Sequence, residues 1–116
     1  MTYTYEDVLA ELQEIIKGRE DYVYEWAEPG ECVNFYHGEP SCLVGHWLAM
    51  HGITEDFFDE YALSLASSVD DLFCVQPDLM PVALDDRARR LLQEVQDRQD
   101  MGTTWGRAVE LSALML

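Results

Sequence analysis

Basic residues are scarce in this sequence of 116 residues. Seven Lys and Arg stand against 23 Asp and Glu, which gives a formal net charge of −16. From Glu20 to Asp86 there is no Lys or Arg, although this span holds 15 of the 23 acidic residues. Direct binding to nucleic acid or to an anionic membrane is disfavoured, because both require cations that neutralise phosphate. The same charge would attract and steer a basic protein partner.

Cysteine is also scarce, and long apolar runs are missing. Cys32, Cys42 and Cys74 form an odd set with no Cys-x-x-Cys pair, which favours free thiols in a reducing compartment. No stretch approaches the roughly 20 consecutive apolar residues of a membrane span. The first residues lack the basic and apolar regions of a signal peptide. We therefore expect a cytoplasmic protein that does not insert into a membrane.

Apolar residues as a class are nevertheless plentiful. Hydrophobic residues make up 48% of the chain and aromatic residues 11%, which argues against disorder despite the charge. A chain of this length is near the common domain size and can bury a core without disulfides or metals. We predict a single globular domain over residues 1–116. It should be mainly α, a compact bundle of about five helices with a small β-hairpin around a central buried helix.

Apolar residues at helical spacing predict four amphipathic helices around that centre. They run from Thr4 to Gly18, from Thr54 to about residue 66, from about Leu84 to Gly102, and from Thr103 or Thr104 to the end. The last segment, residues 111–116, is unusually apolar for a terminus. Either it docks into the core, or it forms an apolar patch for another chain, including a second copy in a homodimer.

The central helix lies between Pro40 and Gly52 and carries no acid, lysine or arginine. On a helical projection, one side gathers large apolar residues and the other side gathers small ones. A helix with no charged face is predicted to be covered on both sides. The candidate functional face is the small-residue side, which consists of Cys42, Gly45, His46 and Ala49.

Aromatic residues alternate on both sides of the Pro29-Gly30 pair, which predicts a β-hairpin over residues 22–36. A lone hairpin is only marginally stable, so we expect it to lie against the helices. The aromatic side chains would either join the core or line a ligand groove. They are Tyr22, Tyr24, Trp26, Phe35 and Tyr36.

Cysteine and histidine residues concentrate around the start of the central helix. Cys32, His37, Cys42 and His46 have the ligand chemistry of a tetrahedral zinc site, although their spacing matches no common zinc finger. The plainer interpretation is a buried thiol with hydrogen-bonded histidines. Cys42 in the first helical turn, with His46 one turn on, would also suit a reactive cysteine. The backbone amides of Ser41 and Cys42 would suit a bound anion such as phosphate.

Two stretches resemble a family of small uncharacterised proteins from actinobacteria and their phages. The first is Gly38-Glu39-Pro40-Ser41-Cys42-Leu43-Val44-Gly45-His46, and the second runs from Leu92 to Val109 and contains Gln99-Asp100-Met101-Gly102-Thr103-Thr104-Trp105-Gly106. The resemblance implies a mycobacteriophage or related origin and a role in an infected host cell. It implies no activity and no catalytic residues.

These observations favour a small, acidic, non-enzymatic accessory protein that binds another protein. The partner we expect is a basic protein, including one that itself binds nucleic acid. The alternative is a metal-binding or ligand-binding protein, or a cysteine enzyme, that uses Cys42 and His46. The favoured interpretation requires no cofactor, and the alternative would add zinc.

Overall fold

The computed structural model describes residues 2–25, 33–75 and 78–116 of the chain. Helices dominate the described residues, which confirms the mainly α prediction. The helices are α1 (Tyr5–Ile16), α2 (Leu43–Met50), α3 (Glu55–Glu60), the π-helical segment η1 (Asp71–Val75), α4 (Asp86–Asp100) and α5 (Trp105–Leu114). None of them is long and apolar enough to cross a bilayer.

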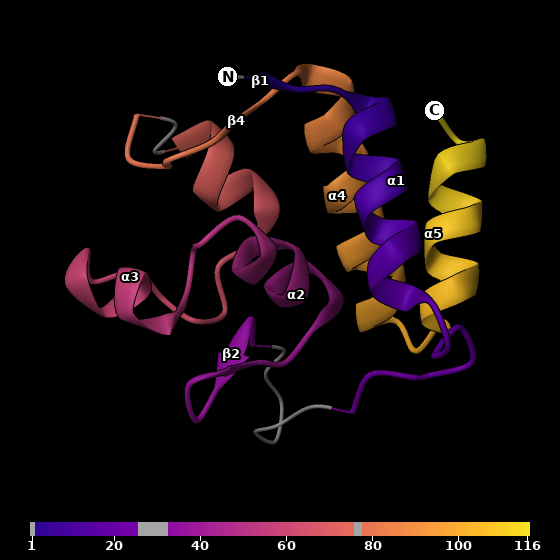
Figure 1. Ribbon diagram of the computed structural model, residues 1–116, viewed down its shortest axis with the longest axis horizontal. Coiled ribbons are helices and arrows are strands. Elements are labelled where there is room, and N and C mark those ends of the chain that lie inside the picture. Colours follow the sequence, from indigo (N-terminus) through magenta and orange to yellow (C-terminus); the bar gives the residue numbers. More distant parts are fainter. Residues whose placement is uncertain (1, 26–32, 76–77) are drawn as a thin grey trace.

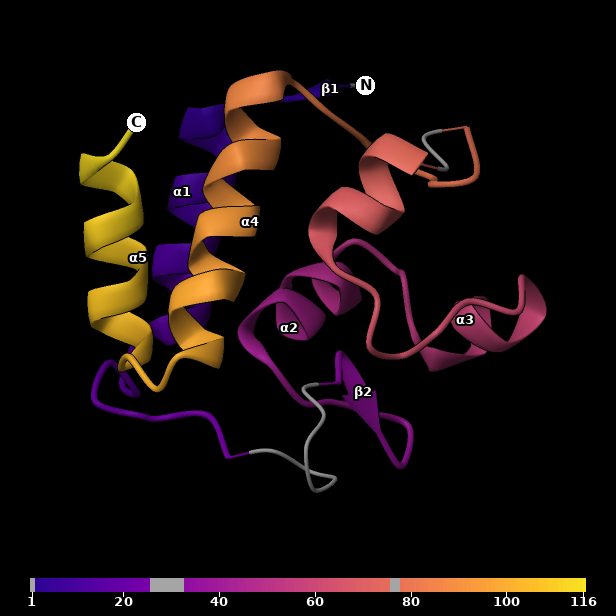
Figure 2. The ribbon, with the colours of Figure 1, turned by 180° about the vertical axis from the view of Figure 1, so that it is seen from behind.

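Three helices, α1, α4 and α5, run side by side and form one half of the molecule (Figure 1). Helix α2 packs against α1 and α4, while α3 lies farther from the three-helix bundle in both views (Figures 1 and 2). The strands are very short. Strand β1 (Thr2–Tyr3) pairs in parallel with β4 (Ala83–Leu84), and β2 (Phe35–Tyr36) pairs antiparallel with β3 (Glu39–Pro40).

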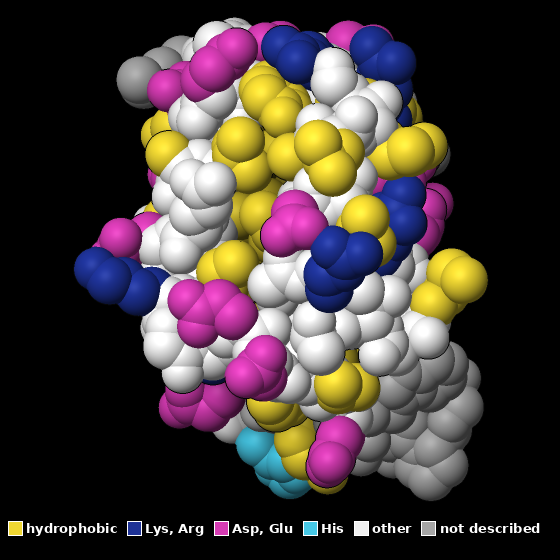
Figure 3. Space-filling view, turned by 90° about the vertical axis from the view of Figure 1, so that its right-hand side faces the viewer, with side chains coloured by type: hydrophobic (Ala, Val, Ile, Leu, Met, Phe, Trp, Pro, Cys, Tyr) yellow, Lys and Arg dark blue, Asp and Glu magenta, His cyan; other side chains and the backbone are white. Residues whose placement is uncertain are grey.

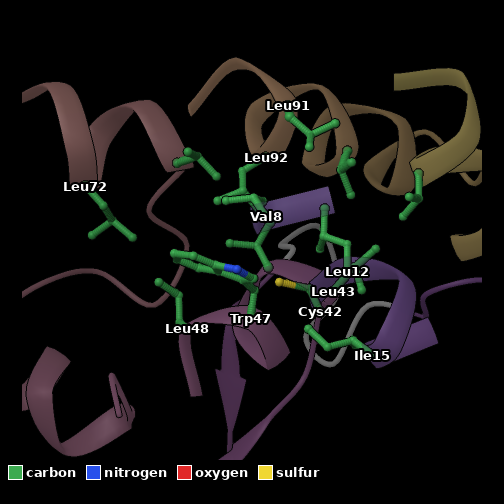
Figure 4. Packing of buried hydrophobic residues seen from close by; sticks show 14 of the residues in the cluster. Val8, Leu12, Ile15, Cys42, Leu43, Trp47, Leu48, Leu72, Leu91 and Leu92 are labelled. Atoms are coloured by element: carbon green, nitrogen blue, oxygen red, sulfur yellow. The ribbon is translucent and has the colours of Figure 1, made fainter. Parts of the chain in front are cut away.

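The core forms where α1, α2 and α4 meet. Trp47 of α2 is fully buried, and apolar side chains of α1 and α4 surround it, including Val8 and Leu92 (Figure 4). Complete burial of one such side chain stabilises the fold by about 1.5–3 kcal/mol. Leu43, Val44 and Leu48 are also buried, whereas Met50 at the end of the helix is 46% exposed. Helix α2 therefore lies in the core, as predicted, up to its last residue.

Helix α1 follows its sequence pattern closely. Thr4 caps it, and the Thr4 hydroxyl and the Asp7 carboxylate exchange hydrogen bonds with each other's backbone amides. The predicted apolar stripe is buried, and Gly18 adopts the left-handed conformation, with φ of 82°. Local capping and one continuous apolar face were enough to place this element.

The hairpin prediction was wrong in its position. Residues 22–25 form no strand, and residues 26–32 lie outside the described part of the chain. The observed hairpin joins β2 to β3 through His37 and Gly38, which have φ of 53° and 81°. Positive φ at both central residues is typical of the two-residue turn that suits strand twist. A histidine in this conformation is uncommon, so the turn had little sequence signal.

Helix α3 is shorter than predicted. It ends at Glu60, and Ala62 then adopts a φ of 55°, which interrupts the helical path before Leu65. The segment after it carries a cap of its own: the hydroxyl of Ser68 accepts the amide of Asp71, whose carboxylate accepts the amide of Ser68. This pair of hydrogen bonds precedes the π-helical segment.

Three glutamines on α4 connect the bundle to the rest of the molecule. They are spaced three residues apart, and the side-chain oxygen of each accepts a backbone N–H from another segment. Gln93 accepts from Asp70 at 2.9 Å, Gln96 accepts from Val69 at 2.9 Å, and Gln99 accepts from Leu43 at 2.7 Å. One face of α4 therefore anchors both the π-helical segment and the start of α2.

Candidate functional site

The two segments singled out in the sequence meet in space. The Gln99 side chain is completely buried and accepts the first amide of α2, that of Leu43. One turn farther along α2, the His46 ring lies edge-on to Trp105, the first residue of α5, with 5.5 Å between the ring centroids. The residues behind the family resemblance therefore build a junction between α2, α4 and α5.

The small-residue face of α2 is covered by Asn34, the residue just before β2. A Cβ atom on Gly45 would overlap the backbone carbonyl oxygen of Asn34, so only glycine allows this approach. The same carbonyl accepts the amide of Ser41 at 2.9 Å. Ala49 is partly buried against the core. This face therefore serves chiefly as a packing surface.

Cys42 caps α2, although the residue before it, Ser41, is of a type more usual at this position. Its thiol accepts the amide of Gly45 at 3.3 Å and donates to the side-chain oxygen of Asn34 at 3.2 Å. The residue is completely buried. A thiol held in this way is not accessible to a substrate, and this arrangement does not support a reactive cysteine.

The proposed zinc ligands are not gathered in the described residues. His37 is exposed at the hairpin turn, Cys42 is buried in its capping role, and His46 packs on Trp105. Residues 2–25, 33–75 and 78–116 contain no group of three or more His, Cys, Asp and Glu that could hold a metal ion. Cys32 lies outside these ranges, so the complete four-ligand set stays a prediction.

The anion site predicted at the amides of Ser41 and Cys42 loses the first of these two donors to a hydrogen bond within the protein. The amide of Ser41 donates to Asn34, and the amide of Leu43 donates to Gln99. Backbone amides that are already paired offer nothing to phosphate. The carbonyl and amide oxygens of the protein itself occupy this helix end.

The aromatic residues predicted to line one groove lie in separate places. Tyr22 lies edge-on to Trp105 with centroids 4.7 Å apart, while Tyr24 is buried and its hydroxyl bonds to the backbone of Val33 and to Ser41. Phe35 is buried against Phe58. Tyr36 is 38% exposed beside His37, and Trp26 lies outside the described residues. No single groove collects the four described side chains.

A small pocket opens beside the junction. Its volume is about 280 Å³, and it is lined by Arg19, Tyr22, Pro40, Ser41, His46 and Trp105. Burial and, secondly, the Arg19 guanidinium lower the pKa of His46 from its ordinary value of 6.5. His46 is therefore neutral at neutral pH, and the pocket carries the single positive charge of Arg19.

A larger groove runs between α1 and α5. Its volume is about 690 Å³, and apolar side chains such as Leu9, Ile16 and Val109 line it. Figure 3 shows hydrophobic side chains along this face, with charged groups beside them. At the end of α5, Leu114 is 77% exposed and Met115 is 65% exposed. The sequence hinted at this surface only through the apolar composition of the last residues.

A partly buried polar cluster lies on the other side of α2. The Nε2 atom of His51 is 2.9 Å from the carboxylate of Glu11, without the alignment of a hydrogen bond. The Trp47 indole donates to the same carboxylate at 3.2 Å, and the Tyr3 ring lies edge-on to the His51 ring.

No known protein family, curated protein or solved structure matches the chain.

Proposed function

We propose that this protein binds a basic protein partner, and that the groove between α1 and α5 receives an amphipathic segment of that partner. The observation that carries the proposal is the groove itself, about 690 Å³ with an apolar floor. Monomeric proteins rarely expose large side chains such as Leu114 in a contiguous apolar patch without a binding role.

The charge of the groove supports a basic occupant. Glu20, Asp21 and Glu110 line it, and the one basic residue beside them, Arg107, already pairs with Glu110 at 2.6 Å. Lys or Arg residues beside the apolar face of an incoming helix would meet these carboxylates. Helix-in-groove binding of this kind places apolar anchors one helical turn apart.

The negative charge of the rest of the molecule would attract a basic partner at longer range. All seven Lys and Arg lie outside residues 20–86, so the half with α2 and α3 is acidic without basic residues. Opposite charge raises association rates at low ionic strength. The protein would thus act as a non-enzymatic accessory protein. The sequence resemblance would place its partner in a phage-infected actinobacterial cell.

Binding of designed helical peptides tests the proposal. A fluorescent peptide with a Leu-rich face and Lys on both flanks should bind wild-type protein. It should bind about tenfold or more weakly to Leu114→Glu, because losing one buried Leu contact costs more than the roughly 1.4 kcal/mol that separates tenfold affinities. Met101→Glu is the matched control, since Met101 is 83% exposed and does not line the groove.

Three outcomes would overturn this assignment. The first is equal binding of a peptide with the same apolar face and Glu flanks, and the second is unchanged binding to Leu114→Glu. The third is a stable dimer in sedimentation that Leu114→Glu dissociates, because the groove would then belong to a second copy of the chain. That dimer is the other partner that the apolar C-terminal helix suggests.

A further inference from the structure

Arg19 differs from the other arginines of this acidic protein. Five of the six, at positions 87, 89, 90, 98 and 107, form ion pairs with carboxylates. Arg19 forms none with the described residues, although 23 carboxylates are present in the chain. A cation that stays unpaired amid so many acids is held in place by other contacts.

Those contacts fix the Arg19 side chain at the mouth of the small pocket. Its Nε atom donates to the carbonyl of Ile15 at 2.9 Å, and its guanidinium carbon lies 5.3 Å from the Trp105 ring centroid. The first contact leaves the two terminal nitrogens of the guanidinium available as donors. Stacking on an aromatic ring further limits the motion of the group.

The described lining of the pocket around Arg19 favours a negatively charged ligand. None of the described residues that line it is Asp or Glu. Ser41 lines the same pocket, and its hydroxyl is hydrogen-bonded to that of Tyr24. The charged group that this lining presents is therefore the Arg19 guanidinium.

We propose that this pocket binds a small oxyanion, a carboxylate or a phosphate, paired with Arg19. The anion would neutralise the charge of Arg19 and accept hydrogen bonds from the two terminal nitrogens of its guanidinium. Its volume of about 280 Å³ limits the ligand to a small molecule or to one charged group of a larger one. This site is separate from the α1–α5 groove and does not depend on its role.

Binding of an anion also changes the environment of His46. Burial and, secondly, Arg19 disfavour the charged imidazolium, and the described residues that line the pocket add no titratable group besides Arg19 and Tyr22. An anion on Arg19 would cancel this repulsion, so the pKa of His46 should rise when the site is filled. Anion affinity should increase correspondingly as pH falls through the His46 titration.

Titration of the full chain with acetate and, separately, with inorganic phosphate tests the proposal. We expect saturable NMR shifts of the His46 ring and of the Trp105 indole N–H, together with a higher His46 pKa. Response to acetate alone identifies a carboxylate site, and response to phosphate alone identifies a phosphate site. Arg19→Gln should weaken the responsive anion about tenfold or more, because hydrogen bonds to charged groups are the stronger ones.

Matched variants separate loss of the site from loss of the fold. Arg107→Gln removes an exposed arginine outside this pocket and should leave the titration unchanged. Arg19→Lys keeps the charge and should retain part of the affinity. Near-ultraviolet circular dichroism confirms that Arg19→Gln remains folded. The proposal is overturned if neither anion gives a saturable shift, or if folded Arg19→Gln responds like wild type.

Discussion

At the residue scale, two glycines allow backbone segments to approach more closely than any side chain would permit. Gly45 meets the carbonyl of Asn34, and a Cβ atom on Gly106 would lie 2.8 Å from the Cβ atom of Glu20. Both glycines belong to the segments that carry the family resemblance, and in this fold their role is structural. A close backbone approach is one of the few reasons a helix tolerates an interior glycine.

Gly45→Ala should destabilise the protein by about 3 kcal/mol or more, at the upper end of overpacking substitutions. The new methyl group would meet backbone, which cannot rotate away as a side chain can. Gly106→Ala should cost less, because its closest contact, with the Cβ atom of Glu20, would be 2.8 Å, whereas the methyl group at Gly45 would overlap a backbone oxygen. Urea denaturation measures both. Equal stability of Gly45→Ala and wild type would contradict the described packing of Asn34 on α2.

His46 should make stability depend on pH. Its pKa in the folded state is lowered by burial and by Arg19, so the unfolded chain binds more protons as pH falls below about 6.5. The free energy of unfolding should therefore decrease on acidification, and it should decrease less in His46→Gln. Denaturation from about pH 7.5 to about pH 5, without phosphate or carboxylate buffers, measures the difference.

The control for this pH series is His37→Asn. His37 is exposed at the hairpin turn with a φ of 53°, and asparagine tolerates that conformation. Its pH profile should stay parallel to that of wild type. Parallel profiles for His46→Gln and wild type would contradict the environment described for His46.

At the element scale, α4 organises the molecule through its glutamines. Gln99 is completely buried and its oxygen accepts the amide of Leu43, which is one of the helix-end donors that α2 cannot satisfy internally. Gln93 makes a similar bond to Asp70 where solvent is closer. The position of α2 therefore depends on a side-chain contact 56 residues away in the sequence.

Gln99→Leu should destabilise the protein by about 1–3 kcal/mol, the cost of a buried donor left without its acceptor. Leucine is close in size, so the effect reports the lost hydrogen bonds more than a cavity. Gln93→Leu, the control, should cost clearly less, because water can replace its partly buried bond. Thermal unfolding of both variants checks this order, and a larger loss in Gln93→Leu would contradict the role given to Gln99.

Local signals in the sequence predicted α1 and α4 well. They failed where contacts between residues far apart in the sequence determine the structure. α1 has a capping residue, one apolar stripe and a terminal glycine, so its bounds follow from neighbouring residues. The hairpin was misplaced because its turn uses His37 at positive φ, while the Pro29-Gly30 pair gave the stronger turn signal. The capping thiol of Cys42 was missed because serine is the more usual cap.

The candidate site, too, was predicted where neighbouring residues determine the structure and missed where distant contacts determine it. Sequence reasoning identified α2 as central and predicted that both of its faces are covered, but it could not show that Asn34 covers Gly45. It noted the apolar end of the chain and left open whether this end docks into the core or forms a patch, and Met115 is 65% exposed. The α1–α5 groove depends on how two helices far apart in the sequence pack, and periodicity within one helix does not report that.

At the scale of the whole molecule, charge is distributed unevenly. The α1, α4 and α5 bundle, with the residues just after α1, holds all seven basic residues, and five of the seven are arginines in ion pairs. The remaining half is acidic only. A basic partner would first be attracted by charge at long range and would then make apolar contacts in the groove. Raising the salt concentration should therefore slow association more than it speeds dissociation.

The groove between α1 and α5 is tested most directly by mapping where a basic amphipathic helix binds. Isotope-labelled protein is titrated with the Lys-flanked peptide, and backbone amide shifts are followed by NMR. We expect the changes to cluster on α1 and α5 around Leu9, Val109 and Leu114, and to disappear in Leu114→Glu. Peptide binding that shifts the residues of α2 and α3 and leaves α1 and α5 unchanged would contradict the proposed function.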